Sequence, residues 1–250
     1  MTSFFYQIYP NMSIKQTVID KATALTNAEF SYSVTARFEE LNDLDHDCSG
    51  IVMDATILYL EIKNLSFLLK TGKRLAARIY KLYYHTLNEI CKETKGFLNC
   101  YAPNAFLMIY PKEQHEVADV VDIALKTADL ISNGLKDIAE LYGHINFSIG
   151  VDRGNILGTK TQSDLGSEHI SWFGTTINKA IAISHECMKP FYVGLSGTVY
   201  QHLDEEHRTA TKRILGIKKH VEMWTTVSYQ FENVKKHLYQ TNFHKSFEEA

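Results

Sequence analysis

The hydrophobic pattern between residues 55 and 96 predicts a buried strand followed by a long helix. Residues 55–62 (ATILYLEI) form a nearly continuous apolar run rich in strand-forming side chains, and the run ends in an acid. Such a run is typical of a central strand covered on both faces. From residue 66 to about residue 95, apolar side chains recur at steps of three, four or seven, as on one face of an amphipathic helix. Gly96 is expected to end that helix.

A hairpin and a second helix follow in the pattern. Residues 97–101 and 105–110 are short strand-like runs separated by Ala-Pro-Asn, which predicts a β-hairpin whose turn is exposed at a strand edge. Residues 115–141 again carry apolar side chains at helical spacing, and Gly143 is expected to end this second helix.

The remaining pattern predicts a second hairpin and several shorter elements. Residues 145–151 and 155–161 are strand-like, and Asp152, Arg153 and Gly154 between them predict a turn. The elements expected after this hairpin are a polar loop over 162–168, a helix over 175–187, a strand over 191–195, a short helix over 197–203 and a terminal hairpin over 214–227.

These elements predict an α+β fold with extensions at both ends. The order β-α-β-β-α-β is that of a ferredoxin-like domain. We expect a helical N-terminal arm and linker over 1–50, a catalytic-size domain over 51–230, and a C-terminal tail over 231–250 that is helical or frayed.

Composition narrows the classes of function. The chain has 250 residues, of which 45% are hydrophobic and 22% charged, with a formal net charge of −3, which is ordinary globular composition. This charge argues against a dedicated nucleic-acid binder.

No run approaches the roughly 18 to 20 apolar residues that span a bilayer, and the N-terminus lacks a basic region before an apolar core. We therefore expect a cytoplasmic protein with no nucleic-acid or membrane partner. The four scattered cysteines suggest neither zinc nor disulfides.

Four segments, in order, resemble the catalytic domain of the class III nucleotidyl cyclases, the adenylate and guanylate cyclases. Residues 59–66 (YLEIKNLS) are similar to the strand and metal motif F-x-D-I-x-x-[FS]-[ST], and residues 95–106 (KGFLNCYAPNAF) to the hairpin motif G-G-x-x-x-K-x-x-G-D-[AG]-F. Residues 147–154 (FSIGVDRG) resemble [RF]-x-G-[IV]-x-x-G, in which a glycine lets chains pack closely. Residues 172–180 (WFGTTINKA) resemble W-G-x-x-[VI]-N-x-A, the most specific of the four. The layout is nearest to stand-alone bacterial cyclases of antiphage signalling that make cyclic pyrimidine nucleotides.

The resemblance implies a two-metal site with altered ligands. In the family, two aspartates hold two divalent ions, Mg²⁺ or Mn²⁺, which bridge a nucleoside triphosphate and activate its ribose hydroxyl. The first aspartate falls on Glu61, which keeps the charge, and the second falls on Asn104, which brings none. Two neighbouring dications need carboxylates to offset their repulsion, so the site is expected to be degenerate.

The remaining family positions are also mixed. The ribose-orienting asparagine is present as Asn178, whereas the transition-state arginine four residues later is replaced by Ala182. Loss of such a cation typically costs orders of magnitude in rate. The base-reading lysine and its partner fall on Cys100 and Ser171, which concern specificity more than activity.

Each of these candidate residues also has a simpler structural explanation that involves no metal or nucleotide. Glu61 could be a solvent-exposed acid at a strand end, and Asn104 suits a turn without any ligand role. Lys63 fits either an exposed lysine or a substitute phosphate contact, and His185 fits a helix surface.

Two hypotheses of function follow. The first is a cyclase homologue, inactive or very weak, that acts through nucleotide binding or dimerisation. The alternative is an active cyclase that converts a triphosphate, such as CTP or UTP, to a 3′,5′-cyclic nucleotide and diphosphate in signalling or antiphage defence, using Glu61 with Asp54 or Asp152. The family works as head-to-tail pairs with the site at the interface, so a homodimer, or a heterodimer with another cyclase domain, is expected.

Overall fold

Strand β2 (Ser49–Ile62) lies in the interior of the main sheet and is longer than the predicted strand over 55–62. The computed structural model describes residues 14–135, 145–162, 168–214 and 217–247. Around β2 the order is β5 (Phe147–Gln162), β2, β4 (Ala105–Pro111) and β3 (Phe97–Ala102), all antiparallel. Together with the crossing helices, this is the predicted ferredoxin-like arrangement, and the α+β fold class is confirmed.

The side chains of β2 alternate between two apolar layers, one on each face of the sheet. Leu58 and Leu60 pack in the layer that contains helices α3 (Lys73–Glu93) and α4 (Val117–Asp129). Ile57 and Tyr59 pack in the layer under helix α6 (Thr175–Glu186). Because strand side chains alternate with a period of two, Glu61 points to the α6 face.

The first crossing helix is broken where the sequence predicted a single helix. Helix α2 (Leu65–Thr71) ends at Gly72, whose φ of 156° is unfavourable for other residues, and α3 begins at the next residue. Gly72 has no other atoms near the position of a Cβ, so the break rests on backbone conformation alone. The second predicted helix is α4 followed by a π turn over 130–134, and its expected last turns, after residue 135, lie outside the described residues.

The predicted hairpin over 145–161 is wrong, because β5 runs straight through the expected turn. Asp152, Arg153 and Gly154 pair with Ile57, Thr56 and Ala55 of β2 in the interior of the sheet. The hairpin partner of β5 is instead β6 (Glu168–Phe173), part of which falls where a loop was predicted.

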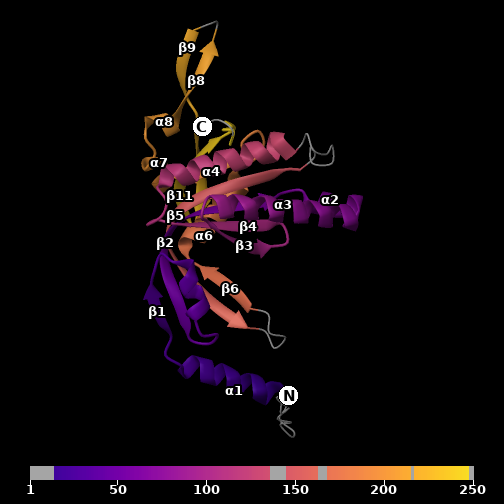
Figure 1. Ribbon diagram of the computed structural model, residues 1–250, viewed down its shortest axis with the longest axis vertical. Helices are drawn as coiled ribbons and strands as arrows, with labels where there is room; N and C mark the ends of the chain where they lie inside the picture. Colours follow the sequence, from indigo (N-terminus) through magenta and orange to yellow (C-terminus); the bar gives the residue numbers. More distant parts are fainter. Residues whose placement is uncertain (1–13, 136–144, 163–167, 215–216, 248–250) are drawn as a thin grey trace.

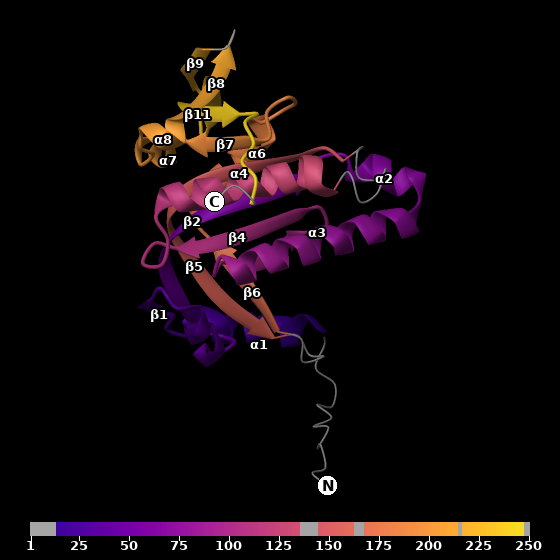
Figure 2. The same ribbon diagram turned by 45° about the horizontal axis from the view of Figure 1, so that its top comes forward.

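The C-terminal residues also differ from the prediction. Strand β11 (Val234–Thr241) inserts between β10 (Thr225–Phe231) and β7 (Val193–Ser196), although this segment was expected to be helical or frayed. Burial of Leu238, which is inaccessible to solvent, accounts for its order. The hairpin predicted over 214–227 is wrong in its bounds, because Lys218 and Lys219, its expected turn, lie within strand β9 (Ile217–Glu222). Strand β9 pairs with β8 (Thr209–Ile214) in a separate two-stranded sheet, which projects from the body in Figures 1 and 2. Two short helices precede it, α7 (Gly197–Gln201) and α8 (Glu205–Arg208).

The N-terminal arm reaches away from the sheet, as Figure 1 shows. Helix α1 (Ile14–Asn27) has no buried residue, and strand β1 (Ser31–Val34) pairs in parallel with the beginning of β2. The 3₁₀ turn over Phe38–Asp43 then buries Leu41 against the layer under α6. The predicted helical arm is thus present, and its attachment to the body begins at β1.

Candidate functional site

The two predicted metal positions lie in contact. Glu61 near the end of β2 pairs with Ala105 at the start of β4, which places Asn104 in the adjacent turn. The Asn104 amide Nδ2 donates to Glu61 Oε1 and to the Ile62 carbonyl oxygen, both at 3.2 Å. The turn therefore holds Asn104 as a hydrogen-bond donor to the acid beside which the family places a second acid.

The other oxygen of Glu61 is engaged by two basic side chains. Lys63 Nζ lies 2.7 Å and His185 Nε2 lies 3.1 Å from Glu61 Oε2, and the Glu61 side chain is only 16% exposed. The sequence did not predict either contact, since Lys63 and His185 were read as surface residues. A signal existed: His185 follows Asn178 by seven residues, two helical turns, so both lie on one side of α6.

These donors do not fit the metal pair that the resemblance implies. Mg²⁺ and Mn²⁺ prefer anionic oxygen ligands, whereas Glu61 is surrounded by an amide NH₂, an ammonium and an imidazole. Among the described residues, no three His, Cys, Asp or Glu side chains are grouped so as to hold a metal ion.

The two other acids considered as substitutes are also misplaced. Asp54 is seven residues from Glu61 on the same strand, about 23 Å away, and its carboxylate pairs with Lys112 and Arg153. Asp152 pairs with Ile57, four residues before Glu61 and hence about 13 Å away along the sheet. Neither acid can share two ions about 4 Å apart with Glu61.

Asp152 is instead a buried carboxyl with a perturbed titration. Asp152 is inaccessible to solvent, and neither of its carboxylate oxygens has a hydrogen-bond partner within normal distance and angle among the described residues. Burial raises the pKa of Asp152 above its ordinary value of 3.8, and the nearby Ser196 hydroxyl and Lys179 oppose this shift only in part. Folding therefore shifts this carboxyl toward its protonated form.

Asp152→Asn is expected to stabilise the protein in a pH-dependent way. A raised pKa in the folded state means that stability present below the unfolded pKa is lost as pH rises toward the folded pKa. The neutral amide avoids that loss, so the gain in melting temperature over wild type should be larger at pH 7.5 than at pH 4.5. Thermal unfolding across this range tests the sign. A variant that loses most stability at pH 7.5 would show that the ionised carboxylate is the favoured form.

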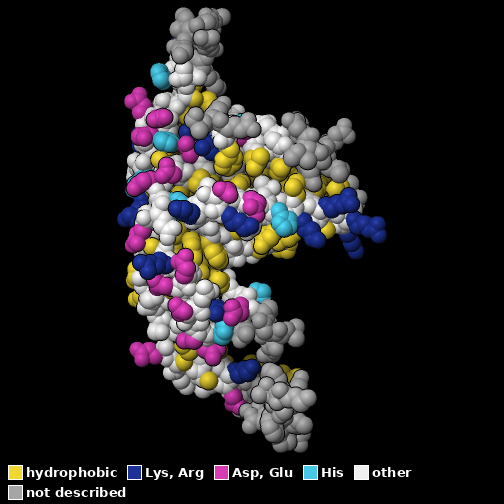
Figure 3. Space-filling model, viewed as in Figure 1, with side chains coloured by type: hydrophobic (Ala, Val, Ile, Leu, Met, Phe, Trp, Pro, Cys, Tyr) yellow, Lys and Arg dark blue, Asp and Glu magenta, His cyan; other side chains and the backbone are white. Residues whose placement is uncertain are grey.

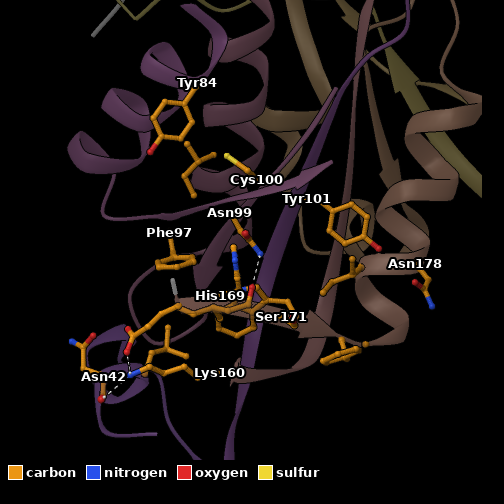
Figure 4. Close-up of a pocket in the computed structure, with 18 residues that line it drawn as sticks. Asn42, Tyr84, Phe97, Asn99, Cys100, Tyr101, Lys160, His169, Ser171 and Asn178 are labelled. Atoms are coloured by element: carbon orange, nitrogen blue, oxygen red, sulfur yellow. Dashed lines mark hydrogen bonds and ion pairs between the residues drawn. The ribbon is translucent and has the colours of Figure 1, made fainter. Parts of the chain in front are cut away.

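Three of the other predicted positions meet at a cavity of about 840 Å³. Cys100 from β3, Ser171 from β6 and Asn178 from α6 all line it, as Figure 4 shows, and Figure 3 shows the hollow on the surface. Neither Glu61 nor Asn104 lines this cavity. One chain thus carries two separate clusters, the Glu61 cluster (Glu61, Lys63, Asn104, His185) and the cavity.

Aromatic rings make up much of the cavity wall. Phe97 and Trp172 pack edge to face with centroids 5.9 Å apart. Tyr84, Tyr101 and Phe173 also line the cavity and remain 37–55% exposed. Exposed rings in a concave site offer faces for a planar ligand to stack against.

Cys100 and Ser171 lie on strands that one hydrogen bond joins. Asn99 Nδ2 donates to the Ile170 carbonyl oxygen at 3.3 Å, which links β3 with β6. Cys100 also interacts with Tyr80 of helix α3. The hydrogen bond between the two side chains, together with partial burial of the Tyr80 ring, raises the pKa of Tyr80 to about 12. A thiol and a hydroxyl thus stand at the two positions that the resemblance assigns to base reading, and both can exchange hydrogen bonds without bringing charge.

The cavity contains one buried cation that the sequence interpretation missed. Lys160 is 8% exposed, and its ammonium pairs with Glu168 at 3.2 Å and donates to the Asn42 carbonyl oxygen at 3.3 Å. Lys160 lies on β5 in a segment that was predicted to be a strand, but its partners come from the N-terminal arm and from β6. No local sequence signal connects these three elements.

Ala182 is partly buried. It contacts the cluster of Ile183, Cys187, Tyr229 and Leu238, to which β10 and β11 contribute. The C-terminal strands of this chain thus pack beside the position on α6 that corresponds to the family's arginine.

Comparison with known proteins supports the fold at low sequence identity. No family model and no curated protein matches the sequence. A guanylyl cyclase crystal structure is similar at a TM-score of 0.62 and 10% identity, covering 80% of this chain and 97% of that one. A class III adenylyl cyclase-like ATP-binding protein from Pseudomonas aeruginosa is similar at a TM-score of 0.63 and 14% identity, and the match covers 80% of this chain and 46% of that one. The guanylate cyclase domain of RhGC from Catenaria anguillulae, solved with GTP, is similar at a TM-score of 0.57 and 18% identity, and the match covers 77% of this chain and 98% of that one.

The structure therefore has the fold of class III cyclase catalytic domains, as the four sequence segments predicted. None of the described helices is long and apolar enough to cross a membrane.

Proposed function

We propose that this chain is a class III cyclase homologue that binds a nucleoside triphosphate but cyclises it very weakly or not at all. The observation that carries the proposal is the environment of Glu61, whose two oxygens contact Asn104, Lys63 and His185. An ammonium 2.7 Å from the acid supplies the positive charge that a metal ion supplies in active cyclases. The packed Ala182 adds a second reason, since no cation stands where charge develops in the reaction.

The cavity is the proposed nucleotide site. Its volume of about 840 Å³ lies within the range of small-molecule pockets, and its aromatic wall suits a base. Asn178 at its rim keeps the family's ribose-orienting amide. A cyclase-like neighbour of this fold is described as an ATP-binding protein, which supports binding as a function in its own right.

A homodimer is part of the proposal. The family pairs the metal half of one chain with the base and ribose half of the other, and these halves correspond here to the Glu61 cluster and the cavity. A two-fold pair would bring Lys63 of one copy toward the nucleotide bound by the other, where its ammonium favours phosphate. We place the protein in the cytoplasm and in nucleotide signalling or antiphage defence, on the resemblance in layout alone.

An active cyclase is the second candidate. Retention of Glu61 and Asn178 favours it, and it would require Mg²⁺ or Mn²⁺ to displace Lys63 from Glu61.

Direct binding separates the two candidates. We expect isothermal titration to detect binding of at least one of ATP, GTP, CTP and UTP with a dissociation constant that EDTA leaves unchanged, because no metal takes part. Asn178→Ala should weaken binding roughly three- to tenfold, the effect of one lost hydrogen bond. Ser171→Trp should abolish it by filling the cavity, whereas Ser228→Trp on β10 serves as the matched control.

The decisive readout is mass detection of cyclic products after long incubation with Mn²⁺. A cyclic nucleotide whose formation disappears in Glu61→Ala would establish the active cyclase and refute the proposal. Triphosphate binding that requires Mn²⁺ would refute it as well.

A further inference from the structure

Helix α3 and the end of α2 carry a concentration of positive charge that the proposed function does not use. Between Glu61 and Glu89 the sequence contains six Lys or Arg residues and no acid, although the chain as a whole carries a net charge of −3. One of the six is Lys63, which pairs with Glu61. The other five are Lys70, Lys73, Arg74, Arg78 and Lys81.

These five cations are exposed and form no ion pair within the part of the chain that the structure describes. Arg74, Arg78 and Lys81 follow one another at steps of four and three, which places them in one stripe along α3. Figure 3 shows the cations gathered where α2 and α3 project from the body. Unpaired like charges repel one another, so this surface is complementary to an extended anion.

Apolar side chains stand beside the cations. Phe67 is 60% and Leu69 49% exposed on α2. Next to them, an open groove of about 660 Å³ runs between α2, α3 and the turn after β3, and Lys73 and Lys81 lie along it. Its remaining lining is mostly apolar and includes Leu65, Ala76 and Pro103.

We propose that the α2–α3 surface docks on an anionic phospholipid membrane. A helix that carries four or more Lys or Arg beside exposed apolar side chains has the two properties that interfacial binding requires: attraction to anionic headgroups and insertion of apolar groups at the acyl boundary. A soluble polyanion would use the cations but not Phe67, Leu69 or the apolar groove. The attachment is peripheral and involves no spanning helix.

Vesicle co-flotation of the full chain tests the proposal. We expect binding to vesicles of phosphatidylcholine with 30% phosphatidylglycerol at 50 mM salt, and at least tenfold weaker binding to pure phosphatidylcholine or at 500 mM salt. Arg74→Glu with Arg78→Glu should weaken partitioning to the anionic vesicles at least tenfold, since each cation near such a surface contributes about 1 kcal/mol. Lys189→Glu with Lys235→Glu makes the same charge change at exposed positions on other segments and should leave binding within twofold of wild type.

A second variant isolates the apolar contribution. Phe67→Ser with Leu69→Ser should weaken binding at least threefold while preserving its salt dependence. Absence of binding to anionic vesicles at low salt overturns the proposal, as does equal loss in the control pair. Unchanged binding in the serine variant, or tighter binding to polyglutamate than to the vesicles, would replace the membrane with an acidic polypeptide. Circular dichroism of each variant confirms that the fold is retained.

Discussion

Gly150→Ala is expected to lower the free energy of unfolding by about 3 kcal/mol or more. A Cβ at position 150 would lie 1.9 Å from the Ala180 carbonyl oxygen and 2.6 Å from the Ser184 amide nitrogen, both in the backbone of α6. These atoms belong to a regular helix, so they cannot move aside singly, and the whole helix must shift. Overpacking of a well-filled core typically costs 1–3 kcal/mol, and a clash with backbone lies at the upper end or beyond.

Urea unfolding followed by circular dichroism measures this loss. Gly197→Ala is the matched control, because the nearest atom to its added Cβ is 4.0 Å away. It should leave the midpoint unchanged or slightly raised. Since α6 carries both Asn178 and His185, Gly150→Ala should also weaken nucleotide binding in whatever fraction remains folded. A variant as stable as wild type would mean that α6 does not pack as closely on β5 as the structure describes.

Gly150 illustrates what could be predicted from sequence. The segment over 147–154 matched a motif in which a glycine permits close packing, and the structure places α6 against that glycine. The strands and helices of the central β-α-β-β-α-β unit were likewise predicted, because each has a clear period of apolar positions.

The errors in the fold arose where local chemistry and tertiary context disagree. Asp152, Arg153 and Gly154 are typical turn residues, yet they lie in the middle of β5, where pairing with β2 outweighs their local preference. Strand β11 begins with four exposed and mostly polar residues, so the sequence shows little alternation of apolar and polar positions there. Pairing with β7 and β10 is what orders this strand.

The sequence could predict which candidate residues lie near one another, but not the groups that surround them. Glu61 and Asn104 lie in contact, and Cys100, Ser171 and Asn178 share one cavity. Which groups surround Glu61 depends on the register of β2 against α6, which no local pattern encodes. For the same reason, the packing of Ala182 under β10 was not foreseeable, because β10 and β11 were not recognised as a continuation of the sheet.

Replacing Lys63 by Met and Asn104 by Asp together is expected to create a divalent-cation site that the wild type lacks. The double variant removes the ammonium from Glu61 and places a second carboxylate where the Asn104 amide now lies 3.2 Å from Glu61 Oε1. Two carboxylates at this distance repel each other, so the variant should be less stable than wild type in EDTA. Mn²⁺ offsets that repulsion by bridging the two carboxylates, so adding Mn²⁺ should restore the lost stability.

Thermal unfolding against Mn²⁺ concentration measures the effect. At a concentration 100 times the dissociation constant, binding to the folded state adds about 2.7 kcal/mol. The wild type and Lys63→Met alone should show little response. Lys92→Met, which removes an exposed lysine paired with Glu89, controls for the loss of an ion pair. A wild type that Mn²⁺ stabilises as strongly as the double variant would show that Lys63 does not take the metal's place.

The same double variant separates metal binding from catalysis. Even with Mn²⁺ bound, it should form no cyclic nucleotide, because Ala182 still lies packed against the cluster of Ile183 and Tyr229 and no cation reaches the reacting phosphate. Adding Ala182→Arg should not restore activity, since a guanidinium beside that apolar cluster is expected to disturb the packing of β10 on α6. Cyclic product from the double variant alone would mean that the metal site is the sole lesion and that another cation serves the transition state.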